Sequence, residues 1–277
     1  MMINSEDIRH FIEEDVGTGD LTALIIPAHT QATAEIVTRE PMIMCGQPWL
    51  DGVIHYIDPT VEVSWQVVEG ASLSADTLLC RLKGPARSLL TAERTALNLL
   101  QTLSATATTA RIYADAVRGS SMQVLDTRKT IPGLRKAQKY AVRCGGCQNH
   151  RMGLFDGILI KENHILAAGS IAKAVEQAKA LSAAIPIEIE VENIDEFREA
   201  LIAGAERIML DNFTLNLIRE AVAINQGKAK LEVSGNADLT FVKAAADTGV
   251  DYVSVGALTK NVKAIDLSMR ITLSGTD

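Results

Sequence analysis

A regular alternation of short β-rich runs and helical segments begins after Gly119, and it constrains the fold more than any other feature of the sequence. Six runs, among them MQVLDTRKT, IEIEVEN and YVSVGAL, each end in polar residues, and helical patterns such as SIAKAVEQAKALSAA separate most of them. Repeated βα units of about 20 to 30 residues predict a parallel sheet, which closes most economically into a barrel. Because only five or six units can be counted, we expect an incomplete or irregular barrel. The polar strand-end residues are Asp126, Lys161, Glu190, Asp211, Ser234 and Ser254.

The first hundred residues have a different, mixed pattern. Short β-like stretches such as ATAEIVT, VEVSWQVVEG and DTLLCRLKG are separated by proline and glycine, which favour turns. Residues 88–117 then show the apolar spacing of one or two long helices. The chain of 277 residues is long enough for one large domain or two ordinary ones.

Composition indicates a folded, soluble, cytoplasmic protein. Hydrophobic residues make up 47% and charged residues 22% of the chain, and no apolar stretch approaches the length of a membrane helix. The acidic start lacks the basic and apolar regions of a signal peptide. Four cysteines are too few for a disulfide framework, and we expect them to remain thiols in a reducing compartment.

The distribution of charge indicates the kind of ligand. The net charge of −7 argues against a nucleic-acid surface, and we expect no nucleic-acid or membrane partner. Residues 128–164 nevertheless contain eight Lys or Arg and two acids, so this segment carries +6 and the remainder carries −13. Cations concentrated in one segment of an acidic protein favour a small, highly charged anion as the ligand.

The cations of this segment have several possible roles. Arg128 and Lys129 follow a predicted strand and suit carboxylate or phosphate, although a solvated basic loop remains an alternative. Lys136 and Lys139 are expected at the surface. Lys161 ends the apolar run GILIK, where it is either a Schiff-base nucleophile, a permanent cation for an anion, or a lysine extending from the core. For each of the histidines of this segment, a structural hydrogen bond is an equally good interpretation.

Acids and glycines at the later strand ends suit phosphate and Mg²⁺. Three glutamates of IEIEVEN share one strand face, which in a closed barrel is the interior or the helix layer, so at least one should reach a cation, a metal or a sugar hydroxyl. Mg²⁺ is commonly held by one or two carboxylates together with substrate phosphates. Asp211, at the end of the next predicted strand, is a further carboxylate of this kind. Ser234, Gly235 and Gly256 follow the last two strands, where barrels often bind phosphate.

Several motifs resemble those of one known family. DTRKTIPGLRKAQKYAVRCGG, NHRMGLFDGILIKENHI, EIEVEN, IMLDNF, EVSGN and DYVSVGALT are similar, in order and spacing, to quinolinate phosphoribosyltransferases. The resemblance also includes EDVGTGDLT, AERTALNLL and AIDLSMR, and it therefore covers nearly the whole chain.

The resemblance implies a reaction and an architecture. Quinolinate and phosphoribosyl pyrophosphate would give nicotinate mononucleotide, pyrophosphate and CO₂, with Mg²⁺, in NAD biosynthesis. The fold would be α/β, with an N-terminal α/β sandwich packed on an incomplete, about seven-stranded α/β barrel. We expect residues 1–106 and the C-terminal segment 266–277 in the sandwich, and residues 107–265 in the barrel. The smallest assembly would be a homodimer in which Arg94 reaches the neighbouring active site, and the resemblance leaves open a higher oligomer built from such dimers.

The resemblance also assigns roles to individual residues. Lys129, Glu190 and Asp211 would be catalytic, and the two acids would also hold Mg²⁺, partly through phosphoribosyl pyrophosphate. Residues expected to bind quinolinate are Arg94, Thr127, Arg128, His150, Arg151 and Lys161. Residues expected to bind phosphoribosyl pyrophosphate are Lys129, Glu162, His164, Glu190, Asp211, Ser234, Gly235 and Gly256.

The stretch RCGGCQNHR raises a separate question about sulfur chemistry. Cys144, Cys147 and His150 lack the fourth ligand of a closed zinc site, and no second CxxC occurs. Family members usually have glycine where Cys147 stands, so a strained loop is expected if that position requires a positive φ. Three rival hypotheses remain: a related enzyme acting on another aromatic acid or linked to metal uptake, a Schiff-base lyase built on Lys161, and a non-catalytic metal-binding module.

Overall fold

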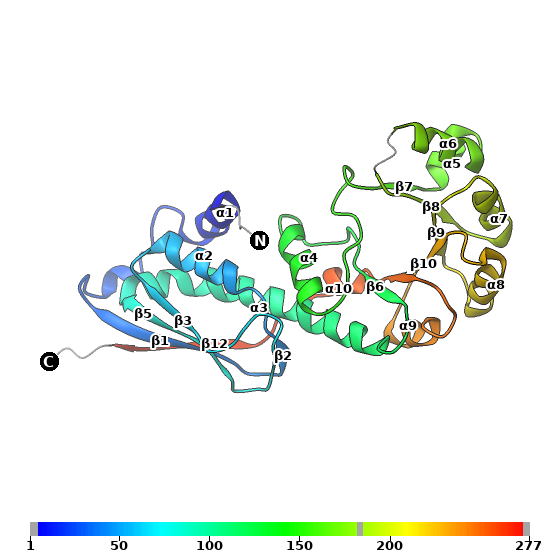
Figure 1. Ribbon diagram of the computed structural model, residues 1–277. Coiled ribbons are helices and arrows are strands. Elements are labelled where there is room, and N and C mark those ends of the chain that lie inside the picture. Colours follow the sequence, from blue (N-terminus) through cyan, green and yellow to red (C-terminus); the bar gives the residue numbers. More distant parts are fainter. Residues whose placement is uncertain (1–4, 182–184, 274–277) are drawn as a thin grey trace. The chain divides into compact units, whose positions relative to one another are not determined.

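The computed structural model describes residues 5–181 and 185–273 as two compact units (Figure 1). The first unit contains the described residues of 1–109 and 262–277, and the second contains residues 110–261. The end of the predicted helical run, at residues 182–184, and residues 274–277 of the expected C-terminal segment lie outside the described residues. No helix of the described chain is long and apolar enough to span a membrane.

The first unit contains an antiparallel sheet and helices. Its four-stranded sheet has the order β12-β1-β5-β3, and the C-terminal strand β12 therefore pairs with β1. Side chains of β1 alternate between buried and exposed, as expected for a strand with one face in a core. The strands are β1 (Gln31–Thr38), β3 (Glu62–Trp65), β5 (Leu78–Pro85) and β12 (Leu267–Leu273), with a separate pair β2 (Met42–Ile43) and β4 (Ser72–Leu73). The helices are α1 (Ser5–Val16), η1 (Ala23–Ile25), α2 (Gln47–Ile57) and most of α3 (Ala86–Ala116), whose residues 110–116 belong to the second unit.

The second unit contains a parallel sheet in the order β6-β11-β10-β9-β8-β7. An isolated parallel bridge between Leu125 and Gln148 continues the pairing beyond β6, where a seventh strand would lie. The strands are β6 (Gln123–Leu125), β7 (Ile158–Ile160), β8 (Ile187–Val191), β9 (Arg207–Asp211), β10 (Lys230–Ser234) and β11 (Tyr252–Ser254). The helices are α4 (Arg135–Cys144), α5 (Glu162–Ala168), α6 (Ile171–Leu181), α7 (Ile194–Ile202), α8 (Leu215–Asn225), α9 (Leu239–Ala245) and α10 (Ala257–Lys260).

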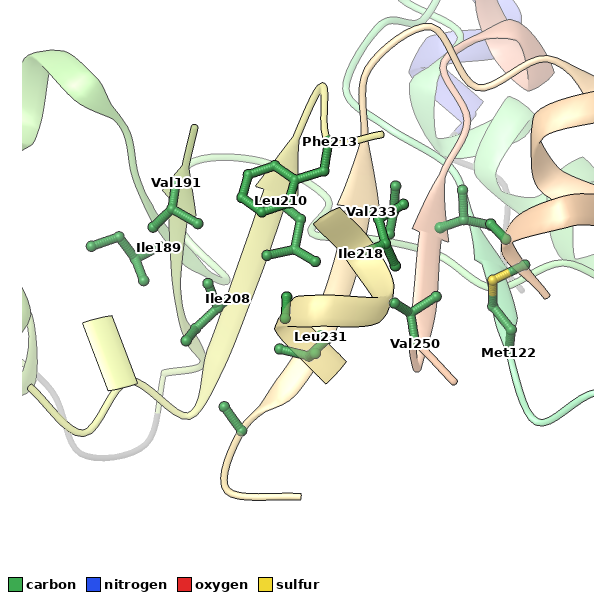
Figure 2. Close-up of a cluster of buried hydrophobic side chains, with 14 of the residues drawn as sticks. Met122, Ile189, Val191, Ile208, Leu210, Phe213, Ile218, Leu231, Val233 and Val250 are labelled. Atoms are coloured by element: carbon green, nitrogen blue, oxygen red, sulfur yellow. The ribbon is translucent and has the colours of Figure 1, made fainter. Parts of the chain in front are cut away.

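The core of the second unit lies between this sheet and the helices outside it. Figure 2 shows Ile218 of α8 packed over the strands that carry Leu210 and Val233. Three successive βα loops end in side-chain caps, because Asn193, Thr214 and Asp238 accept hydrogen bonds from backbone N–H groups three residues later. The polar residues that follow these strands therefore cap the next helix, and they lie at the carboxyl end of the parallel sheet.

The fold class expected from the sequence is confirmed. The six polar strand-end residues all lie at the ends of parallel strands or directly after them, and the barrel is incomplete. The sheet has six strands and one bridge among the described residues rather than about seven full strands. The single helix α3 accounts for the long helical pattern before the barrel.

Candidate functional site

Two adjoining cavities open at the C-terminal ends of the strands in the second unit. The larger has a volume of about 630 Å³ and the smaller about 170 Å³. Carboxyl ends of parallel strands are where ligands bind in barrels of this kind. Both cavities are lined by Thr127, Lys129, Lys161, Glu190, Ser234 and Ser254, so these residues form the junction between them.

The larger cavity is shaped by the main chain after β9 and β10. Gly235 has a φ of +100°, and a Cβ placed there would lie 2.2 Å from Asn212 Oδ1. The Asn212 N–H donates to the carbonyl of Ser234 at 2.9 Å, which ties the two loops together. Asn212 and Asn236 also have positive φ angles, of 56° and 42°. Only glycine fits between these loops, because both the conformation and the space exclude a side chain.

Gly256 and Lys129 also line the larger cavity. A Cβ on Gly256 would lie 3.1 Å from Cδ of Lys129, so the glycine makes room for the lysine side chain. The Lys129 carbonyl accepts a hydrogen bond from the Thr259 hydroxyl at 2.8 Å, which fixes the lysine's main chain. The sequence analysis did not single out Asn236, Lys260 and Asn261, which also line this cavity.

Three carboxylates line the larger cavity, and Asp238 is the one that caps α9, so the other two are the candidates for binding a ligand. Glu190 is buried and forms an ion pair with Lys161, whose side chain is 43% exposed. Asp211 Oδ2 accepts a hydrogen bond from Asn212 Nδ2 at 2.8 Å. The two acids match the donor set that Mg²⁺ uses together with substrate phosphates. The Lys161 side chain is partly exposed and paired with a carboxylate, whereas a Schiff-base lysine is commonly desolvated in an apolar pocket.

The smaller cavity has cationic walls. Arg128, Arg151 and Lys161 line it, together with Leu159 and Met209. The buried Nε of Arg128 has no hydrogen-bond partner within residues 5–181 and 185–273. Arg151 Nη1 donates to the carbonyl of Gly157 at 3.0 Å. Burial, together with the charge of Arg128, lowers the pKa of Arg151. An anionic ligand in this cavity would relieve the repulsion between the two guanidinium groups.

Both ring nitrogens of His150 are already engaged by the protein. Nδ1 accepts the Arg151 backbone N–H at 2.7 Å, and Nε2 lies 2.9 Å from Oε2 of Glu188. An accepting Nδ1 means that Nε2 carries the proton, so the ring is a neutral imidazole. Burial lowers the pKa of His150, which also favours the neutral form. His150 therefore lines the smaller cavity as a fixed, neutral ring.

A buried ionic cluster lies below the smaller cavity, and the sequence analysis missed two of its members. Arg207 Nε donates to Glu188 Oε1 at 3.0 Å, and its Nη2 pairs with Glu232 Oε2. The Ser254 hydroxyl contacts Glu232 Oε1. The alternating acids of IEIEVEN had indicated that a cation must be near, but the cation lies on the next strand, where Arg207 pairs in register with Glu188.

The expectation that Lys139 lies at the surface is wrong. Lys139 is fully buried and forms an ion pair with Asp126, which is also fully buried. Asp126 accepts hydrogen bonds from Asn149 Nδ2 and from the His150 N–H, and Lys139 Nζ donates to the carbonyl of His150. The pair therefore holds the segment that carries His150 and Arg151, and Lys136 on the same helix is exposed.

The strain anticipated at Cys147 is absent as well. The positive φ in this loop belongs to Gly146, at +99°, and not to Cys147. Cys147 is buried, and its thiol donates to the carbonyl of Ala110 at 3.1 Å. Burial raises the pKa of the thiol to about 12, so it has little thiolate character at neutral pH. Cys147 is a core residue that supports the loop before His150.

Three of the expected site residues line neither cavity. Arg94 is an exposed residue of α3 in the first unit. Glu162 and His164 lie in the first turn of α5, where His164 Nδ1 accepts the Lys161 N–H at 2.9 Å. All the other residues that the sequence analysis assigned to the site line one or both cavities. They are Thr127, Arg128, Lys129, His150, Arg151, Lys161, Glu190, Asp211, Ser234, Gly235 and Gly256.

Comparison with known proteins identifies similar sequences and structures over nearly the whole chain. Residues 20–104 match the family described as quinolinate phosphoribosyl transferase, N-terminal domain, and residues 106–270 match its C-terminal domain. The probable nicotinate-nucleotide pyrophosphorylase (carboxylating) of Bacillus subtilis is 41% identical over 268 residues, which cover 96% of this chain and 93% of the relative. The enzyme of that name from Mycobacterium leprae is 40% identical over 274 residues, covering 95% of each chain. The solved structure of nicotinate-nucleotide pyrophosphorylase from Francisella tularensis has a TM-score of 0.94 and 48% identity over 98% of each chain.

Proposed function

Since this chain belongs to the quinolinate phosphoribosyltransferase family, it is a phosphoribosyltransferase, and we propose that it converts quinolinate and phosphoribosyl pyrophosphate to nicotinate mononucleotide, pyrophosphate and CO₂. This reaction belongs to de novo NAD biosynthesis. The observation that carries the proposal is a pair of adjoining cavities, one suited to a small dianion and one to a phosphorylated sugar.

The smaller cavity takes quinolinate. Two carboxylates leave water when this acid is buried, and that cost is met only where cations and donors replace the lost hydration. The side chains of Arg128, Arg151 and Lys161 line this cavity and supply three positive charges. Leu159 and Met209 provide apolar surface for the pyridine ring.

The larger cavity takes phosphoribosyl pyrophosphate. The loops at Gly235 and Gly256 allow the main chain to approach a phosphate closely, and Lys129 supplies a cation beside them. Glu190 and Asp211 lie across the same cavity and suit the ribose side of the substrate.

The junction between the cavities is where the two substrates meet. Departure of pyrophosphate leaves positive charge on the ribose, and the Glu190 carboxylate is placed to stabilise that charge. Lys161 pairs with Glu190 and fixes its position. After transfer the pyridine nitrogen is a cation, and loss of the adjacent carboxylate as CO₂ gives a charge-neutral ylide. Loss of CO₂ itself needs no base and is favoured in a site with little bulk water and well-placed cations. The ylide must then take up one proton, from water or a protonated protein group, at the carbon that lost the carboxylate, which gives nicotinate mononucleotide.

Mg²⁺ is the cofactor that the two acids suit. Asp211 and Glu190 would hold it, partly through the substrate's phosphates. When bound, the ion would neutralise charge on the departing pyrophosphate. Because Glu190 is already paired with Lys161, Asp211 is the carboxylate more available to the ion.

The remaining assignments concern residues outside the two cavities. Arg94 lines neither cavity of its own chain, so the role that the resemblance assigns to it is proposed for the active site of a partner subunit in a homodimer. Glu162 and His164 contact phosphoribosyl pyrophosphate only if α5 moves toward the larger cavity. The cytoplasmic location remains an expectation from composition.

The test is product formation by the purified protein. Quinolinate, phosphoribosyl pyrophosphate and Mg²⁺ should give equal amounts of pyrophosphate, CO₂ and nicotinate mononucleotide. Nicotinate, which lacks the second carboxylate, should give no product. Turnover with nicotinate would show that the smaller cavity requires only one carboxylate on the substrate. Absence of turnover with both acids would refute the proposed reaction.

A further inference from the structure

The cluster below the smaller cavity contains two acids and one permanent cation. Glu188, Glu232 and Arg207 line neither cavity, and Glu188 and Glu232 are 4% and 0% exposed. With both acids ionised and His150 neutral, the cluster has a net charge of −1. That charge would lie against His150 and Ser254, which line the cavity that takes a dianion, and its cost would be high because water is excluded.

Hydrogen bonds indicate where an additional proton would reside. His150 Nδ1 accepts the Arg151 N–H, so a proton added there would remove that bond. Glu188 receives Nε2 of His150 and Nε of Arg207, which are two donors suited to an ionised carboxylate. Glu232 Oε1 faces the Ser254 hydroxyl, which is able to accept as well as donate. Glu232 is therefore the member of the cluster whose contacts remain satisfied after protonation.

We propose that Glu232 is a positioning residue that carries a proton when the acid substrate is bound, so that the cluster below the smaller cavity is neutral. Its effect reaches the substrate through His150, which lies 3.5 Å from Glu232 Oε1 and lines the cavity. The inference rests on the proposed function, because it concerns the dianionic acid that the cavity takes.

The surroundings of Glu232 agree with this role. The charged or titratable groups near it are Glu188 on β8, Arg207 on β9 and His150 in the loop before β7, and the Tyr252 ring lies 4.4 Å from the Arg207 guanidinium carbon. Burial, and then the charge of Glu188, raise the pKa of Glu232 to about 7. Below that pH the cluster is neutral, and above it the cluster becomes negative and repels the acid.

The test compares the pH dependence of KM in three proteins, namely wild type, Glu232→Gln and Glu206→Gln. The wild-type KM for quinolinate should rise by up to about tenfold per pH unit above pH 7, because binding then requires proton uptake. Glu232→Gln keeps the cluster neutral at every pH, so its KM should change by less than about twofold over the same range. Neither substitution should alter the pH dependence of the KM for phosphoribosyl pyrophosphate. Glu206 is an exposed acid directly before β9, and its substitution should leave the wild-type profile intact.

A Glu232→Gln enzyme with the wild-type pH profile would overturn the proposal. A second measurement applies even if that variant does not fold. Calorimetric titration of the wild type with quinolinate at pH 8, in buffers of different ionisation enthalpy, should show uptake of close to one proton per acid bound. Binding without proton uptake would also overturn the proposal. Proton uptake by a wild-type protein that shows no turnover would instead refute the proposed reaction and support the role of Glu232.

Discussion

The two cavities share a junction but are built in different ways. The larger depends on main-chain geometry, since Gly235 and Asn212 have positive φ angles and leave no room for an extra carbon atom. The smaller depends on side-chain charge, with arginines above and a buried ionic cluster below. A substitution that alters main-chain geometry should therefore weaken ligand binding in the larger cavity, and a substitution that removes charge should weaken binding in the smaller one. The predictions below test that distinction, from the largest expected effect to the smallest.

Replacing Arg151 with alanine should reduce kcat/KM for quinolinate on the order of 10³-fold, because it leaves a buried substrate carboxylate without its partner. The KM for phosphoribosyl pyrophosphate should change little. Steady-state kinetics with each substrate varied in turn would measure both effects, and circular dichroism would check the fold. Arg219→Ala, at an exposed position on α8, is the control. An active Arg151→Ala enzyme would contradict the assignment of the smaller cavity.

Replacing Lys139 with methionine should lower the free energy of unfolding by about 3 kcal/mol, because Asp126 is left buried without its cation. Activity should fall with it, since the pair holds His150 and Arg151. Lys136→Met on the same helix should change neither quantity, because Lys136 is exposed. Chemical denaturation of the three proteins measures the difference, and equal stabilities would show that the buried pair is not required.

Replacing Gly235 with alanine should raise the KM for phosphoribosyl pyrophosphate by about tenfold while leaving binding of quinolinate nearly unchanged, because the new Cβ would collide with Asn212. Gly227 also has a positive φ, of +75°, but a Cβ there meets no atom within 4 Å, and it lies outside both cavities. Gly227→Ala therefore tests for general backbone strain. If both variants bind the two substrates equally well, the larger cavity does not depend on the close approach of these loops.

Replacing Cys147 with alanine should cost only about 1 kcal/mol of stability, because it leaves a small cavity in the core. Activity should be retained, since the buried thiol faces Ala110 and not the site. Thermal unfolding and a standard assay would measure both effects. Loss of activity without loss of stability would reveal a chemical role for this thiol.

Much of the site could be predicted from the sequence because polar residues follow each strand at a regular spacing. Parallel strands bring such residues to one edge whatever the details of packing, which is why Lys129, Lys161, Glu190 and Asp211 lie together. The resemblance to the family then supplied the substrates.

The buried charges could not be predicted in the same way. Lys139 has the sequence context of a surface residue, and only the packing of α4 places it against Asp126. Arg207 is the first residue of β9, and Glu232 lies in the middle of β10. Their pairing depends on the register between neighbouring strands, which the sequence does not specify. At Cys147 the positive φ lies on the adjacent Gly146, and a count of glycines cannot identify which residue adopts it.

The most direct test of the division between the cavities is a crystal structure with quinolinate and a stable analogue of phosphoribosyl pyrophosphate bound together. Quinolinate should lie in the smaller cavity, with its carboxylates accepting from the guanidinium groups of Arg128 and Arg151, and its ring nitrogen facing the junction at Glu190 and Lys161. The pyrophosphate and ribose should lie beside Gly235 and Gly256 in the larger cavity. Quinolinate bound in the larger cavity, or quinolinate that contacts neither Arg128 nor Arg151 in the complex, would contradict the account.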